Sequence, residues 1–172
     1  MTRFTRRALI AALAAVLPLS SAFAQDIKER SFKFATQNPK GHPIVAGADK
    51  FAEIVAAKSG NKLQVKVFPG GTLGGDAANV SALQGGTIEM VVLNSGILGS
   101  QVKDFEVYDF PFMFANAKEA DAVVDGPFGQ KLHAKLADKG IVGLGYFELG
   151  FRNITNSKRP ITKVEDIAGL KL

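Results

Sequence analysis

The spacing of apolar residues switches several times between residues 31 and 93, and this alternation constrains the fold more than any other feature of the sequence. Apolar and polar side chains alternate at 31–36, which predicts a strand, and the apolar residues at 63, 65 and 67 predict a second one. Residues 88–93 are apolar enough to form a third strand buried on both faces.

Helical patterns separate these strands. Apolar residues recur at helical spacing from Pro43, with a proline in the first turn and Gly60 just past the expected end. A shorter helix is predicted from Asp76, acting as the cap, to about Gln84. The resulting order β-α-β-α-β predicts an α/β fold with a parallel sheet and right-handed crossovers.

Beyond residue 93, helices are expected at 117–124 and 128–137, followed by a strand at 141–147. An extended, glycine-interrupted stretch continues through Arg152, and such a segment is suited to carry a chain from one lobe into another. The final residues, 167–172, have the pattern of a helix end, a glycine and the beginning of a strand. We therefore expect these 172 residues to be the front part of a longer protein.

Residues 1–24 have the pattern of a cleaved export signal. Three arginines precede an apolar run at 8–19, and Ala-Phe-Ala at 22–24 fits a signal-peptidase site. The alternative, a membrane anchor, is disfavoured because the run is shorter than the ~20 residues that span a bilayer. The adjacent Arg6 and Arg7 allow either the general secretory or the twin-arginine route. The predicted location is the bacterial periplasm.

Charge and cysteine content exclude several functions. Three of the 21 Lys and Arg residues, and none of the 16 Asp and Glu residues, lie in the predicted leader, so the remainder has a net charge of only +2. This balance does not support binding to nucleic acid. The absence of Cys excludes disulfides, thiolate metal sites and cysteine nucleophiles.

Other catalytic motifs are missing as well. The glycine-rich stretch 69–75 lacks the residues of a phosphate-binding loop, and a tight turn before the next helix is the preferred interpretation. His42 and His133 do not have metal-ligand spacing, and His42 is expected in a loop or at a helix entry, with ligand contact as the alternative. We predict no cofactor and no metal.

Five polar residues remain as candidates for a ligand site. Gln37 and Asn38 follow the first predicted strand, Asn94 follows the third, and Glu148 and Arg152 lie in the glycine-broken stretch. In an open parallel sheet the ligand crevice lies beyond the carboxyl ends of the strands, so we expect these positions to converge where a ligand would bind.

Arg152 stands among apolar residues and glycines, where a charge requires a partner. A guanidinium can hold a carboxylate through two parallel hydrogen bonds. The alternative is a structural salt bridge to Glu148, four residues earlier. Arg159, beside Pro160, is expected to be a solvated loop charge.

The sequence resembles the TRAP-transporter solute-binding proteins of the DctP family over essentially the whole chain after the leader. The strongest stretches are GYFELGFRNITNSKRPI at 145–161 and EDIAGLKL at 165–172. Shorter matches are FKFA at 32–35, VFPGGTLGG at 67–75, EMVV at 89–92 and VYDFPFMF at 107–114.

This resemblance implies two α/β lobes of the periplasmic binding protein type, with parallel-type sheets and a cleft that closes on an organic acid. Residues 25–147 would form the first lobe, and 148–172 the crossing segment and the beginning of the second. Arg152 matches an arginine that contacts the acid, whereas a second, carboxylate-clamping arginine follows Gly-Leu-Lys-Leu in the family, beyond residue 172. Asn94 and Gln37 match ligand positions less closely, and Glu148 departs from the family pattern in a way that suits sugar hydroxyls.

The family function implied is a non-enzymatic receptor, monomeric at full length, that delivers a dicarboxylate, keto acid or sugar acid to a membrane permease. A small secreted α/β enzyme, such as a hydrolase, remains the alternative. For residues 25–172 alone we expect poor binding and a tendency to associate, because half of the cleft would be missing.

Overall fold

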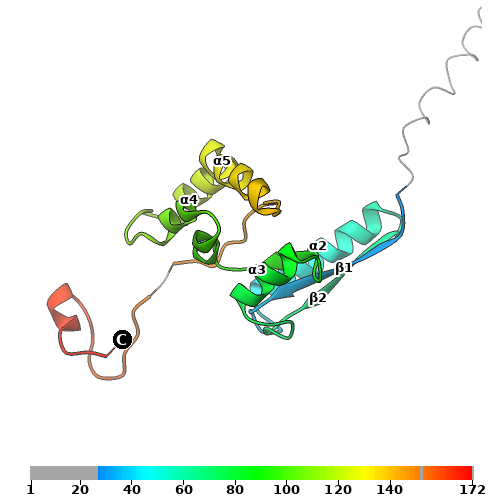
Figure 1. The fold of residues 1–172 in the computed structure, drawn as a ribbon. Coiled ribbons are helices and arrows are strands. Elements are labelled where there is room, and N and C mark those ends of the chain that lie inside the picture. Colours follow the sequence, from blue (N-terminus) through cyan, green and yellow to red (C-terminus); the bar gives the residue numbers. More distant parts are fainter. Residues whose placement is uncertain (1–26, 152, 172) are drawn as a thin grey trace, which may run out of the picture.

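The computed structural model describes residues 27–151 and 153–171, so the predicted leader and Arg152 lie outside the described residues. The first elements are β1 (Arg30–Thr36), α2 (Pro43–Lys58), β2 (Leu63–Phe68), α3 (Asp76–Gln84) and β3 (Met90–Val92). The three strands form one parallel sheet in the order β2-β1-β3. Figure 1 shows α2 running along the paired β1 and β2. The predicted β-α-β-α-β order and parallel sheet are confirmed.

Helix α2 begins where the sequence predicts. His42 is its N-cap, and the Ile44 amide donates a hydrogen bond to His42 Nδ1 at 3.2 Å. The prediction of His42 at a helix entry is therefore confirmed. The Phe51 ring meets Phe34 of β1 edge-to-face, with ring centroids 6.0 Å apart, and Ala48 is completely buried. These contacts hold α2 on the sheet.

Two details of the next crossover differ from the prediction. The N-cap of α3 is Gly75, which has the extended conformation that this position requires, so Asp76 is the first helical residue and not the cap. Strand β3 is shorter than predicted, and its residues are half-buried rather than buried on both faces. The reason is its position: among the described residues β3 pairs only with β1, at the edge of the sheet.

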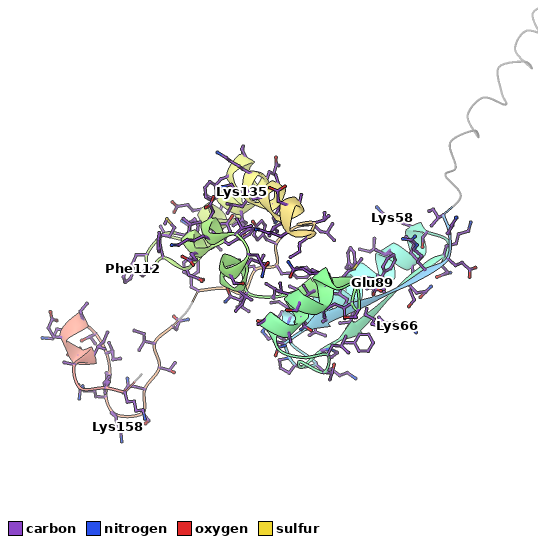
Figure 2. The ribbon with its side chains drawn as sticks, in the orientation of Figure 1. Lys58, Lys66, Glu89, Phe112, Lys135 and Lys158 are labelled. Carbon is purple, nitrogen blue, oxygen red and sulfur yellow. The ribbon has the colours of Figure 1, made fainter. Side chains whose placement is uncertain are left out.

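A helical layer follows the sheet. It comprises the 3₁₀ segments η2 (Ser95–Ser100) and η3 (Lys103–Asp109) and the helices α4 (Ala117–Val124) and α5 (Pro127–Leu136). The two predicted helices are confirmed, and Figure 1 shows them packed together beyond α3. The hydrophobic core of this layer consists of Phe105, Leu132 and Leu136, together with Val80 from α3 and Ile141 from the segment after η4. In the loop between η3 and α4, Phe112 projects into solvent (Figure 2) with a left-handed φ of 60°.

The predicted strand at 141–147 is wrong. After η4 (Ala137–Lys139), Gly140 turns the chain with a φ of 71°, and residues 141–150 have no regular secondary structure. An extended segment becomes a strand only when a neighbouring backbone pairs with it, and no described residue pairs with this one. A short 3₁₀ segment, η5 (Val164–Ile167), follows near the end of the described chain.

Candidate ligand-binding site

The carboxyl end of β1 is held rigidly by its own side chains. Thr36 is buried, and its hydroxyl oxygen accepts a hydrogen bond from the Asn38 amide at 3.2 Å. The same hydroxyl lies 3.1 Å from Asn38 Oδ1 and donates to it. The turn that presents Gln37 and Asn38 is therefore fixed before any ligand arrives.

The glycine-rich loop 69–75 is fastened to this turn. The Gly70 amide donates to the Asn38 carbonyl at 2.8 Å, and the Gly71 amide donates to the Thr36 carbonyl at 3.0 Å. Gln37 Nε2 donates to the Gly74 carbonyl. These amides already have acceptors, which supports the interpretation of 69–75 as a tight turn and not a phosphate cradle.

Gly71 is required where the loop meets Gln37. Its φ is +70°, a conformation that residues with a Cβ adopt at a cost, and a Cβ would lie 2.8 Å from Gln37 Oε1. The close approach of loop and side chain therefore depends on glycine at this position.

Asn94 is at the corresponding end of β3. Its Oδ1 accepts a hydrogen bond from the Gly96 amide at 3.0 Å and caps η2. Because Thr36 faces Val92 in the parallel register, Asn38 and Asn94 each follow that register pair by two residues. The structure thus brings Gln37, Asn38 and Asn94 to the same edge of the sheet.

We call these three residues the amide edge. The Nδ2 groups of Asn38 and Asn94 have no hydrogen-bond acceptor among the described residues, so both can donate to a ligand oxygen. Amide donors at strand ends suit carboxylate and hydroxyl groups, and they supply no nucleophile.

Sequence analysis missed a polar residue beneath the glycine-rich loop. Asn79 of α3 is completely buried, and its Nδ2 donates to the Gly74 carbonyl at 3.1 Å, while its Oδ1 has no partner among the described residues. Asp76 Oδ1 is also buried and unpartnered, and burial raises the pKa of this carboxyl. No local pattern singles out Asn79, because polar and apolar residues are mixed around this short helix.

The other predicted residues are not joined to the amide edge. Glu148 is exposed, and no hydrogen bond or ion pair links it to another described residue. The proposed Glu148–Arg152 salt bridge falls outside the described residues because Arg152 does. Arg159 is exposed as expected, but its Nε and Nη2 donate to the Asp166 and Ala168 carbonyls at 3.1 and 2.6 Å.

Other surface features do not define a second site. An open hollow at 154–161 is formed by one loop, marked by Lys158 in Figure 2, and its lining includes no residue of the amide edge. Within residues 27–151 and 153–171 no cluster of His, Asp and Glu side chains is arranged to hold a metal ion. The same residues include no helix long and apolar enough to cross a bilayer.

A parallel α/β lobe with polar side chains at the carboxyl edge of its sheet, followed by an extended exit segment, has the architecture of one lobe of a periplasmic binding protein. Comparison with known proteins gives the particular class. The chain belongs to family 7 of the bacterial extracellular solute-binding proteins, the DctP family, whose model matches residues 34–172. This family consists of solute-binding proteins and not of enzymes.

Individual relatives agree with this assignment. The chain is 36% identical to the C4-dicarboxylate-binding periplasmic protein DctP of Rhodobacter capsulatus over 177 aligned residues, which cover 100% of this chain and 51% of that protein. Two crystal structures superpose with a TM-score of 0.80. One is a TRAP periplasmic solute-binding protein from Ochrobactrum anthropi, 56% identical over 84% of this chain and 45% of that one, with its C-terminus bound in the ligand-binding pocket.

The second is the sugar acid binding protein DctPAm from Advenella mimigardefordensis in complex with galactonate. It is 42% identical, and the match covers 85% of this chain and 47% of that chain. The present chain therefore spans about half the length of the relatives it matches.

Proposed function

We propose that this chain is the first part of a periplasmic receptor that captures an organic acid and delivers it to the membrane permease of a TRAP-type transporter. The observation that carries the proposal is the convergence of Gln37, Asn38 and Asn94 at the carboxyl edge of a parallel sheet. Family membership and the periplasmic, acid-binding relatives support it.

The proposed domain arrangement keeps the division expected from the sequence. In this proposal residues 25–147 belong to the first lobe, and residues 148–172 to the crossing segment and the beginning of a second lobe. Support comes from the relatives, which are about twice as long as the match. Ligand capture then requires closure of two lobes around the acid.

The assigned roles combine charge and neutral donors. The Arg152 guanidinium binds the carboxylate of the acid, and the free amide donors of Asn38 and Asn94 bind its other oxygens. The Glu148 carboxylate accepts hydrogen bonds from hydroxyl groups, which favours a sugar acid over a simple dicarboxylate. The relative with bound galactonate supports this choice of substrate class.

Isothermal titration calorimetry on the longest polypeptide that the gene encodes tests the proposal. The panel is an aldonate (D-galactonate), a uronate (D-glucuronate) and a C4-dicarboxylate (succinate). Heat of binding without chemical change of the acid is the expected result. Conversion of the acid to a product would favour the secreted enzyme instead, and absence of binding to any acid would reject the receptor.

Arg152→Ala should weaken acid binding about tenfold or more, because charge-assisted hydrogen bonds to the carboxylate are lost. Arg159→Ala is the matched control, since this arginine donates to two carbonyls of its own loop. Equal affinity in the Arg152→Ala variant and the unmodified protein would favour the alternative role of Arg152, a structural salt bridge with Glu148.

A further inference from the structure

The segment that leads to Glu148 is irregular, yet it is attached at defined points. Ile141 is buried in the helical core, and its amide donates to the Leu136 carbonyl at 3.1 Å. The next apolar side chains, Val142 and Leu144, are 76% and 75% exposed. Burial of these two side chains therefore does not hold the segment in place.

Tyr146 makes the next attachment. Its ring stacks on His133 of α5, with centroids 4.5 Å apart and an interplanar angle of 11°. Its hydroxyl lies 3.2 Å from the hydroxyl of Tyr108 in η3, at hydrogen-bond distance. A Cβ at Gly143 would overlap the His133 ring, so the backbone also passes directly against this ring.

Phe147 contacts helix α2, which packs on the sheet. A Cβ at Gly47 would lie 2.8 Å from Phe147 Cε1, so the phenylalanine ring occupies the space that a side chain on α2 would take. Glycine in a helix interior is unfavourable, and this close packing gives Gly47 a structural purpose. Adjacent residues thus attach the chain to α5 on one side and to α2 on the other.

The pKa values of Tyr146 and His133 are shifted in the directions that keep the two stacked rings uncharged. Burial, together with the hydrogen bond and proximity to Tyr108, raises the pKa of Tyr146. Burial lowers the pKa of His133, and the nearby Asp125 opposes this shift in part. At neutral pH both stacked rings are therefore uncharged.

We propose that Tyr146 and Phe147 are positioning residues, which fix the direction in which the chain leaves the first lobe and so place Glu148 for the ligand. This inference rests on the proposed function for its effect on binding. The attachment raises the fraction of molecules in which the crossing segment has the binding-competent position, and apparent affinity scales with that fraction.

The experiment compares variants of the longest polypeptide that the gene encodes. Tyr146→Leu removes the stack and the hydroxyl contact, whereas Tyr146→Phe keeps the stack. Gly47→Ala displaces the Phe147 ring. Leu144→Ala, in the same segment but exposed, is the matched control. Calorimetry measures affinity for the acid of the panel that binds tightest.

An independent spectroscopic measurement reports the attachment without ligand. The NMR resonance of His133 Cε1–H, assigned through His133→Gln, should be shifted upfield by the stacked Tyr146 ring. Tyr146→Leu should abolish this shift, and Tyr146→Phe should retain it. Absence of the shift in the unmodified protein would overturn the attachment.

For affinity, loss of an aromatic stack should weaken binding about tenfold in Tyr146→Leu and about threefold in Gly47→Ala. Tyr146→Phe should bind within about threefold of the unmodified protein, because only a hydrogen bond is lost. Leu144→Ala should bind normally. Unchanged affinity in Tyr146→Leu despite a lost NMR shift would overturn the positioning role and leave the receptor function intact. A polypeptide that shows the shift but binds no acid would instead reject the receptor function.

Discussion

The amide edge and the segment 148–151 both carry predicted ligand groups, but they are held in different ways. At the amide edge every side chain has a hydrogen-bond partner close by: Gln37 donates to the Gly74 carbonyl, Asn38 accepts from the Thr36 hydroxyl, and Asn94 accepts from the Gly96 amide. In the segment, Glu148 is exposed and has no bonded partner among the described residues.

This difference separates two ways of preparing a binding site. Hydrogen bonds to their carbonyl oxygens fix the side-chain amides of Asn38 and Asn94 in advance, so little conformational entropy is lost at that edge when a ligand binds. Among the described residues, the segment with Glu148 is held by contacts upstream of it, through Tyr146 and Phe147. For the receptor proposed above, ligand capture by closure would use the amide edge as a fixed wall.

The largest expected effect tests the rigidity of the amide edge. Gly71→Ala should lower the free energy of unfolding by about 2–3 kcal/mol, because it adds backbone strain at positive φ and disrupts the Gln37–Gly74 hydrogen bond. Gly70→Ala is the control: its φ is +68°, but a Cβ there meets no atom within 4 Å. Gly70→Ala should lower the free energy of unfolding, measured by urea unfolding, by about 1 kcal/mol less than Gly71→Ala does. Equal losses would show that Gln37 does not fasten the loop.

A smaller effect compares the two regions directly. Asn94→Ala should lower the free energy of unfolding by about 1 kcal/mol, because the Gly96 amide loses its capping acceptor. Glu148→Ala should change it by less than about 0.5 kcal/mol, as is usual for an exposed residue without partners. Thermal unfolding of both variants measures the contrast, and a Glu148→Ala loss as large as that of Asn94→Ala would contradict it.

The smallest effect concerns pH and the attachment of the segment. Burial lowers the pKa of His133 below its ordinary value of 6.5, so the unfolded chain takes up a proton first as the pH falls. Stability is therefore fully present above pH 6.5 and decreases between that value and the lower folded-state pKa. We expect this loss to be the smallest of the three effects, because solvent screens this half-buried ring.

The His133→Gln variant should lack this part of the pH dependence in urea unfolding measured from pH 7.5 to 5. An unchanged slope in the variant would assign the acid sensitivity to another group.

Much of the sheet and part of the site follow from the sequence. The β1 to α3 order, the entry of α2 at His42 and the tight turn at 69–75 are local consequences of spacing, proline and glycine. Convergence of Gln37, Asn38 and Asn94 then follows from parallel pairing, since strand ends meet at one edge.

Residues whose role depends on distant neighbours were not predicted. In the sequence Asn79 is an ordinary helical residue, and its role is visible only in the structure, where its side-chain amide donates to the Gly74 carbonyl of the neighbouring loop. The contact between Phe147 and Gly47 joins residues a hundred positions apart, and no local pattern connects them.

The sequence by itself determined the order of strands and helices, the parallel topology and the family, because these depend on periodicity and on short motifs. Only the tertiary structure decided the state of residues 141–147, whose pattern predicts a strand but whose backbone pairs with no described neighbour. Strand formation requires a partner, and a stacking contact requires a ring at the right place in space. Both are properties of non-local packing, and in this protein they decide the path of residues 141–147.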